Sequence, residues 1–260
     1  MKKKIAILGS TGSIGKTLVE LIKKDKRNFK IELLTANKNY KELLNQAKTL
    51  KVKNIIITDE KSFIKLKKKK IKNIKIFNNF KHLNVIFKNK IDYVMSSISS
   101  IHGLEPTLQI IKYTKKIAIA NKEAIICGWH LIKKDLNRFK TSFIPVDSEH
   151  FSIFYGLKGN DIANIEKIYL TASGGPLRNT PKVKFKSIKV EEAIKHPNWK
   201  MGKKISIDSA TMMNKVFEII EAKKIFDLKY DKLEILVHPV SYIHAITKFK
   251  DGMITIIAHD

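Results

Sequence analysis

Short apolar runs alternate with stretches of helical periodicity along the first part of the chain, at intervals typical of strand–helix–strand units. This pattern predicts an α/β fold built on a parallel sheet. The predicted strands of that sheet are residues 4–8, 31–36, 54–57, 93–96, 116–120 and 142–146. Beyond them, the sequence predicts a strand at 165–171 and a hairpin of 243–249 and 253–258 around an Asp-Gly turn. The lysine-rich stretch 65–75 is expected to form a loose excursion.

A glycine-rich turn follows the first predicted strand. Gly9, Gly12 and Gly15 have the spacing G-x-x-G-x-x-G, and a helix is predicted to begin within this run. Glycines at a helix N-terminus let a pyrophosphate approach the backbone amides, although an ordinary strand-to-helix turn explains the run equally well.

The end of the second predicted strand bears on the cofactor. The run 37–39 reads Asn-Lys-Asn, where an NAD site usually has an acid that binds the ribose hydroxyls. This favours NADPH, and the alternative is that Lys38 is one more surface lysine.

Two carboxylates, Asp147 and Glu149, follow the last strand of the predicted parallel sheet. Together they can bind a hard divalent cation through oxygen, and a third ligand must come from elsewhere. The best candidate is Glu218, on a helix predicted to begin near Asp208 and Ser209 as N-cap and to run to about residue 226. On this helix Asn214, Glu218 and Glu221 share one face, and the apolar contacts are expected from Met212, Met213, Val216, Phe217 and Ile220. The alternative is a solvated polar face.

A long polar segment follows the strand predicted at 165–171. It opens with Ala-Ser-Gly-Gly-Pro at 172–176 and reaches Trp199 within the run 196–202. A lid that closes over a substrate has this composition, and so does an irregular surface loop with a packed tryptophan.

Composition narrows the function. The 260 residues carry a formal net charge of +27, which would favour binding to nucleic acid. The basic residues are nearly all lysines, however, because the arginines are Arg27, Arg138 and Arg178 alone. Base recognition depends on arginine. We therefore expect no nucleic-acid partner, and the charge can instead steer anionic substrates. No apolar stretch is long enough for a membrane span or for the core of a signal peptide, so we expect no membrane contact. Cys127 is the single cysteine, which is consistent with a reducing compartment. We therefore expect a cytoplasmic protein.

Six strings together resemble the 1-deoxy-D-xylulose 5-phosphate reductoisomerase family: GSTGSIG (9–15), ANKEA (120–124), PVDSEH (145–150), ASGGP (172–176), HPNWKMG (196–202) and KISIDSATMMNK (204–215). The resemblance covers essentially the whole chain. It implies a Rossmann-like NADPH-binding domain at 1–146 and an α+β catalytic domain at 147–260, with a lid at about 173–203. It also implies NADPH-dependent rearrangement and reduction of a small phosphorylated sugar, and a homodimer.

The resemblance assigns roles to particular residues. Asp147, Glu149 and Glu218 would hold one Mn²⁺ or Mg²⁺, with Lys122 as a further catalytic group. The implied cofactor-binding residues are Thr11, Gly12, Ser13, Ile14, Asn37, Lys38, Asn39, Asn121, Glu123 and Gly202. The implied substrate-binding residues are Lys122, Ser148, Glu149, Ser173, His196, Trp199, Ser209, Asn214, Lys215 and Glu218.

Three departures from the family pattern qualify these expectations. Asn37 and Ala172 stand where the family usually has glycine. Both are small changes, and Asn37 makes the adenosine-side contacts less certain. Family members also continue past residue 260 into more of the catalytic domain and a C-terminal helical domain. We therefore expect the catalytic domain to be incomplete at its end and the helical domain to be absent. NADPH binding is then expected to survive better than turnover. Two alternatives stay open: another NADP-dependent dehydrogenase, and a basic protein that binds nucleic acid in a salt-sensitive way.

Overall fold

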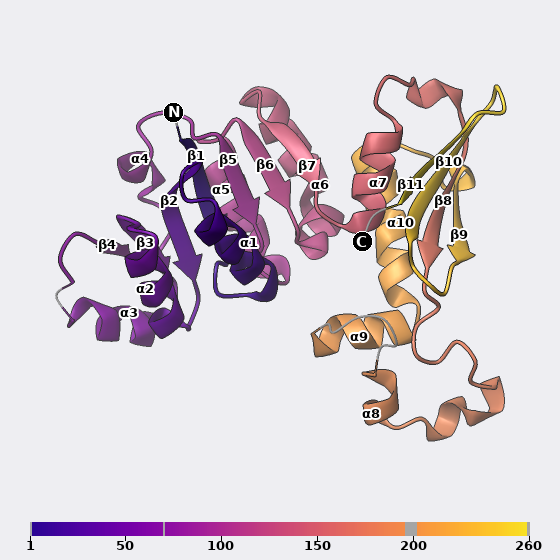
Figure 1. Cartoon of the computed structure of the whole chain (residues 1–260), viewed down its shortest axis with the longest axis horizontal. Helices are drawn as coiled ribbons and strands as arrows, with labels where there is room; N and C mark the ends of the chain where they lie inside the picture. The colour runs from indigo at the N-terminus through magenta and orange to yellow at the C-terminus, as the bar shows by residue number, and fades with distance from the viewer. Residues whose placement is uncertain (1, 70, 196–201, 259–260) are drawn as a thin grey trace. The chain divides into compact units, whose positions relative to one another are not determined.

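The structure is a computed structural model that describes residues 2–69, 71–195 and 202–258 (Figure 1). The chain divides into two compact units, residues 1–146 and 147–260. Among the described residues, no helix combines the length and the apolar character needed to cross a membrane.

The first unit is a seven-stranded parallel sheet of order β4-β3-β2-β1-β5-β6-β7. Its strands are β1 (Lys3–Leu8), β2 (Phe29–Ala36), β3 (Asn54–Ile57), β4 (Lys75–Phe77), β5 (Tyr93–Ser96), β6 (Lys116–Ile119) and β7 (Ser142–Pro145). Its helices are α1 (Ser13–Lys24), α2 (Tyr40–Thr49), α3 (Glu60–Lys67), α4 (Leu83–Ile86), η1 (Ile101–Gly103), α5 (Leu104–Ile111) and α6 (Lys122–Arg138).

A buried apolar cluster joins the sheet to α1, α2 and α3. It contains Ile5 and Ile7 from the central strand, packed with Val19 of α1, Leu43 of α2 and Leu66 of α3. Every second residue of a strand faces the same side, so these helices cover one face of the sheet. Strands β2, β3 and β4 are added on one side of β1, and β5, β6 and β7 are added on the other side. In open sheets of this kind, ligands bind at the carboxyl ends of the strands near the point where the strand order changes direction.

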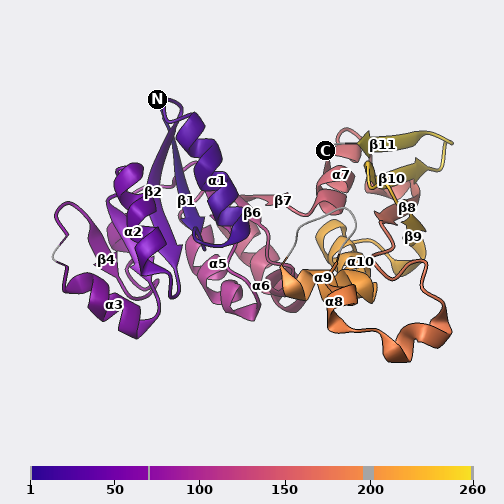
Figure 2. The same cartoon turned by 60° about the horizontal axis from the view of Figure 1, so that its bottom comes forward.

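The second unit is a four-stranded sheet of order β11-β10-β8-β9, in which β8 pairs antiparallel with β10 and parallel with β9 (Figure 2). Its strands are β8 (Ile165–Ala172), β9 (Leu233–Val237), β10 (Ile243–Phe249) and β11 (Ile254–Ala258). Its helices are α7 (Ser148–Gly156), η2 (Ile162–Asn164), η3 (Lys182–Ser187), α8 (Val190–Ala193), α9 (Lys203–Ala210), α10 (Met213–Phe226) and η4 (Tyr230–Lys232). Helices α7 and α10 pack on one face of this sheet around Ile153, Leu170 and Phe226.

The predicted α/β class is confirmed, and most predicted strands lie within two residues of the observed ones. Two strands were missed. β4 lies at the end of the stretch predicted to be a loose excursion, and β9 had no prediction.

The helix predicted from Asp208 onward is wrong in its start and in its buried face. Asp208 and Ser209 lie in the last turn of α9 rather than at an N-cap. Met212 has φ of 61°, which interrupts the helical backbone before α10 begins. Lys215 and Glu218 are only 5% and 1% exposed, whereas Met213 and Val216 are 40% and 44% exposed. The polar face is therefore the buried one, because the apolar core of the second unit begins further along α10.

Candidate functional site

The turn after β1 is shaped by two close backbone approaches. Gly9 has φ of +79°, and a Cβ there would lie 2.7 Å from the carbonyl oxygen of Ser97. A Cβ at Gly15 would lie 2.3 Å from the carbonyl oxygen of Gly9, so both positions require glycine. The Gly9 amide donates to Thr35 Oγ1 at 2.9 Å, which ties the turn to β2.

Helix α1 begins at the end of this turn without a side-chain cap. Gly12 is its N-cap, and Gly12, Ser13 and Ile14 are exposed while Thr11 is half-buried. The first amides of a helix lack intrahelical acceptors and carry a partial positive charge. This N-terminus can therefore receive a pyrophosphate, which is the role predicted for residues 11–14.

In the loop after β2, two asparagine side chains have local hydrogen-bond partners, and the lysine between them is exposed. Asn37 Nδ2 donates to Thr58 Oγ1 at 2.9 Å, and Asn39 Oδ1 accepts from the amide of Glu42 and so caps α2. Lys38 is exposed. The side chain that replaces the family's usual glycine thus has a local partner in Thr58.

Asn121 caps α6 and anchors the loop before η1. Its Nδ2 donates to the carbonyl oxygens of Ile98 and Ser100, and its Oδ1 accepts from the amide of Ala124 at 2.8 Å. Both ends of the Asn121 side chain therefore have protein partners. The predicted residues Lys122 and Glu123 are half-buried in the first turn of α6.

The three predicted metal ligands lie together in the second unit. Asp147 is the N-cap of α7, Glu149 lies in the first turn of that helix, and Glu218 comes from α10. Each offers one carboxylate oxygen, and these oxygens all lie within 4.8 Å of one another. Oxygen donors at this separation suit a hard divalent cation after small side-chain adjustments.

A lysine ammonium lies against two of these acids. Lys215 Nζ is 2.7 Å from Glu149 Oε1 and 2.5 Å from Glu218 Oε2, and the side chains of all three residues are largely buried. Burial on its own would lower the pKa of Lys215, but the charges of Glu218 and Glu149 outweigh it and raise that pKa above its ordinary value. Lys215 is therefore charged.

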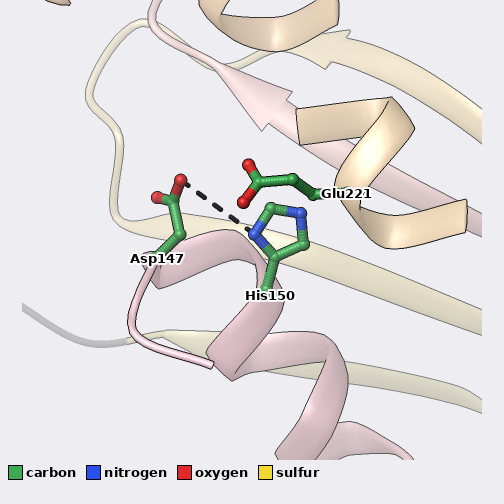
Figure 3. A group of neighbouring side chains, drawn as sticks. All are labelled: Asp147, His150 and Glu221. Atoms are coloured by element: carbon green, nitrogen blue, oxygen red, sulfur yellow. Dashed lines mark ion pairs between the residues drawn. The ribbon is translucent and has the colours of Figure 1, made fainter. Parts of the chain in front are cut away.

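A second group shares Asp147 and was missed from the sequence as a group. It comprises Asp147, His150 and Glu221, whose ligand atoms also lie within 4.8 Å of one another (Figure 3). His150 Nδ1 is 4.0 Å from Asp147 Oδ2, while His150 Nε2 donates to the carbonyl oxygen of Glu218 at 2.9 Å. His150 thus connects the first turn of α7 to α10. The signal in the sequence was the Asp147–His150 spacing of one helical turn.

The predicted substrate-binding residues fall into two sets. Ser148 Oγ donates to Glu149 Oε2 at 2.7 Å, and Asn214 Nδ2 donates to Glu218 Oε1, so both adjoin the carboxylates. Ser173 lies after β8, and Ser209 lies near the end of α9. The two segments approach each other closely at Gly175, where an added Cβ would lie 2.5 Å from the carbonyl oxygen of Ser209.

Two predicted residues, His196 and Trp199, lie outside the described residues, as does the rest of 196–201. Gly202 is described as the exposed N-cap of α9. Between 173 and 195, the predicted lid contains η3 and α8 and exposes Val183 and Phe185.

A parallel sheet with a glycine turn at its central strand places the first unit among α/β dinucleotide-binding folds. The second unit adds a carboxylate group suited to a divalent cation. Residues 5–128 match the family profile "1-deoxy-D-xylulose 5-phosphate reductoisomerase", and residues 143–226 match the profile of that enzyme's C-terminal domain. The chain belongs to the 1-deoxy-D-xylulose 5-phosphate reductoisomerase family, a family of enzymes.

Relatives of the same name align along nearly all of the chain. The protein of Pelagibacter ubique is 64% identical over 99% of this chain and 67% of its own length, and that of Clostridium tetani is 44% identical over 97% and 67%. The chain therefore spans about two thirds of the length of these relatives.

Solved structures of the family share the fold. The reductoisomerase of Zymomonas mobilis in complex with NADPH matches with a TM-score of 0.90 and 34% identity, over 100% of this chain and 68% of that chain. A reductoisomerase in complex with NADPH, fosmidomycin and magnesium matches with a TM-score of 0.88 and 32% identity, over 98% and 66%.

Proposed function

We propose that the chain performs the NADPH-dependent and metal-dependent conversion of 1-deoxy-D-xylulose 5-phosphate to 2-C-methyl-D-erythritol 4-phosphate, a step of non-mevalonate isoprenoid biosynthesis. The observation that carries the proposal is the group of three carboxylates from α7 and α10, whose oxygens lie within 4.8 Å. Family membership supports it, and two solved relatives are described as complexes with NADPH.

NADPH fits the first unit. The amides at the start of α1 receive the pyrophosphate, and residues 11–14 supply them. Lys38 is exposed beside the N-terminus of α2, where its charge favours a 2′-phosphate over a free hydroxyl. When bound, NADPH would supply the hydride that reduces the aldehyde formed by the rearrangement, and a proton would complete the product alcohol.

A divalent cation fits the second unit. The donor set consists of carboxylate oxygens, and the ion pairs of Lys215 with Glu149 and Glu218 support a preference of this group for positive charge. Asp147, Glu149 and Glu218 would hold Mg²⁺ or Mn²⁺. When bound, the ion supplies Lewis-acid polarisation of the substrate's carbonyl and hydroxyl oxygens.

The remaining predicted residues bind, orient and shield the substrate. Lys122 stabilises negative charge on a substrate oxygen, and Ser148 binds beside Glu149. Ser173, Ser209, Asn214 and Lys215, together with His196, bind the phosphate and orient the carbon skeleton. Trp199 and the segment 173–203 close over the site and exclude water.

A second candidate is that the chain binds NADPH through the turn before α1 and turns the substrate over slowly. A different NADP-dependent dehydrogenase is a third candidate, and its activity would persist after chelation of divalent ions. The homodimer and the cytoplasmic location stay predictions from the sequence.

The test is NADPH oxidation with 1-deoxy-D-xylulose 5-phosphate, with and without Mn²⁺, and NADPH binding measured separately. Glu149→Gln keeps the shape of the side chain and removes a ligand charge, so kcat/KM should fall by at least about a hundredfold, since loss of outer-shell partners alone costs 10–100-fold. Glu234→Gln, in the same unit, removes an exposed acid as the matched control. Turnover unaffected by chelation, or by Glu149→Gln, would refute the proposal. NADPH binding without turnover would select the second candidate.

A further inference from the structure

The Lys215 ammonium satisfies the two glutamates of the carboxylate group. It contacts Glu149 Oε1 at 2.7 Å and Glu218 Oε2 at 2.5 Å. The other oxygen of Glu149 accepts from Ser148 Oγ, and the other oxygen of Glu218 accepts from Asn214 Nδ2. All four glutamate oxygens therefore have a protein partner.

Two buried carboxylates side by side are costly without a positive charge. The side chains of Glu149 and Glu218 are 13% and 1% exposed, and that of Lys215 is 6% exposed, so water supplies little of the compensation. Lys215 is the group that neutralises this pair. A divalent ion would neutralise the same two acids, because Glu149 and Glu218 belong to the candidate metal group.

We propose that Lys215 is the internal counter-cation of the metal-free site, that it leaves the two glutamates when a divalent ion binds, and that the released ammonium then binds the anionic group of the substrate. The inference rests on the proposed function, because it takes the carboxylate group as the metal site. Metal binding and anion binding are then coupled through one side chain.

Position and chemistry favour this exchange. Lys215 lies in the first turn of α10, next to Asn214 and after the short break that separates α10 from Ser209. Its flexible four-carbon stem lets the ammonium move several ångströms while the helix stays in place. Linkage then requires reciprocity: if the metal frees Lys215 for an anion, the anion must raise the affinity for the metal by the same factor.

The first experiment measures Mn²⁺ binding to the 260-residue chain by calorimetry, without NADPH or substrate. Lys215→Met removes the competing ammonium, so Mn²⁺ affinity should rise by about tenfold, within the range typical of coupled sites. Lys248→Met is the matched control, since Lys248 lies in the same unit and pairs with exposed Glu166. Its affinity should stay within about twofold of wild type because exposed charges are screened.

The second experiment measures coupling with methylphosphonate as the anion. In the wild type, saturating Mg²⁺ should raise methylphosphonate affinity by about fivefold or more, and in Lys215→Met this ratio should fall to about one. An enhancement that survives in Lys215→Met overturns the inference, because the anion then gains its affinity from another source.

A wild-type measurement covers the case in which Lys215→Met does not fold. Acylation of lysines by acetic anhydride, read by peptide mass spectrometry, should modify Lys215 at least about threefold faster once Mn²⁺ is bound, because an ion-paired and buried amine reacts slowly. Lys248 should not change. Unchanged or slower modification of Lys215, or Mn²⁺ affinity that is unaffected by Lys215→Met, refutes the exchange and leaves the proposed function in place. Absence of Mn²⁺ binding in the wild type would refute both.

Discussion

Replacing Gly175 with alanine should loosen the contact between the loop after β8 and the end of α9. Gly175 has φ of +68°, and an added Cβ would lie 2.5 Å from the carbonyl oxygen of Ser209 and 3.1 Å from its carbonyl carbon. That carbonyl accepts from the amide of Met212 at 3.1 Å and so closes the turn that leads into α10. Moving it would shift the backbone just before Asn214 and Lys215.

The cost has two parts. An alanine in the left-handed region loses about 1–2 kcal/mol relative to glycine. Relieving a clash with backbone atoms, which cannot rotate away, costs about 1–3 kcal/mol more. We expect Gly175→Ala to lower the free energy of unfolding by about 2–5 kcal/mol. Gly159→Ala is the matched control, because Gly159 has φ of +79° with no atom within 4 Å of the added Cβ, so it pays the first part alone.

Differential scanning calorimetry is the assay, because two compact units can unfold in separate transitions. Both glycines lie in the second unit, so both variants are read from the same transition. We expect Gly175→Ala to melt at least about 4 °C below Gly159→Ala, and to raise KM for the phosphorylated substrate. Equal melting temperatures for the two variants would refute the close approach as a source of strain.

Three further predictions follow from the first unit. A Cβ at Gly15 would lie 2.3 Å from the Gly9 carbonyl oxygen, so Gly15→Ala should weaken NADPH binding, measured by cofactor fluorescence, by about tenfold or more. Lys38→Glu should weaken NADPH binding more than NADH binding, and an equal loss for both cofactors would refute the role of Lys38. Asp92 accepts a hydrogen bond from Lys115, which lowers the pKa of its carboxyl below 3.8. The stability it contributes is present above 3.8 and lost as the pH falls through the folded-state pKa, so the melting temperatures of Asp92→Asn and wild type should converge in acid.

The parallel sheet was predictable because its strands are buried on both faces and appear as continuous apolar runs. The exceptions have physical reasons. β4 has three residues, Lys75–Phe77, too few to show a period within a lysine-rich stretch. β9, Leu233–Val237, pairs with β8, which lies far from it in the sequence, and it exposes most of its apolar side chains. Neither strand therefore has an apolar pattern in its own sequence that distinguishes it from the neighbouring residues.

The residues of the candidate site were predictable from motifs, whereas their contacts were not. Periodicity assigns the apolar side of a helix to the core, which is why Met213 and Val216 were expected to be buried. No sequence pattern shows that Lys215 lies between Glu149 and Glu218, because Glu149 is on another helix. The break at Met212 likewise depends on a left-handed residue that local propensity disfavours.

The buried charges of α10 are difficult to explain as a contribution to stability. Lys215, Glu218 and Glu221 are 5%, 1% and 2% exposed. Replacing buried ionic groups with apolar side chains of similar volume is often neutral or stabilising, so the fold alone does not require them. Where local pattern and fold disagree in this way, the position is usually retained for function. The polar face of α10 is buried although the apolar pattern of this helix predicts that it is exposed, and this face carries Glu218 of the carboxylate group.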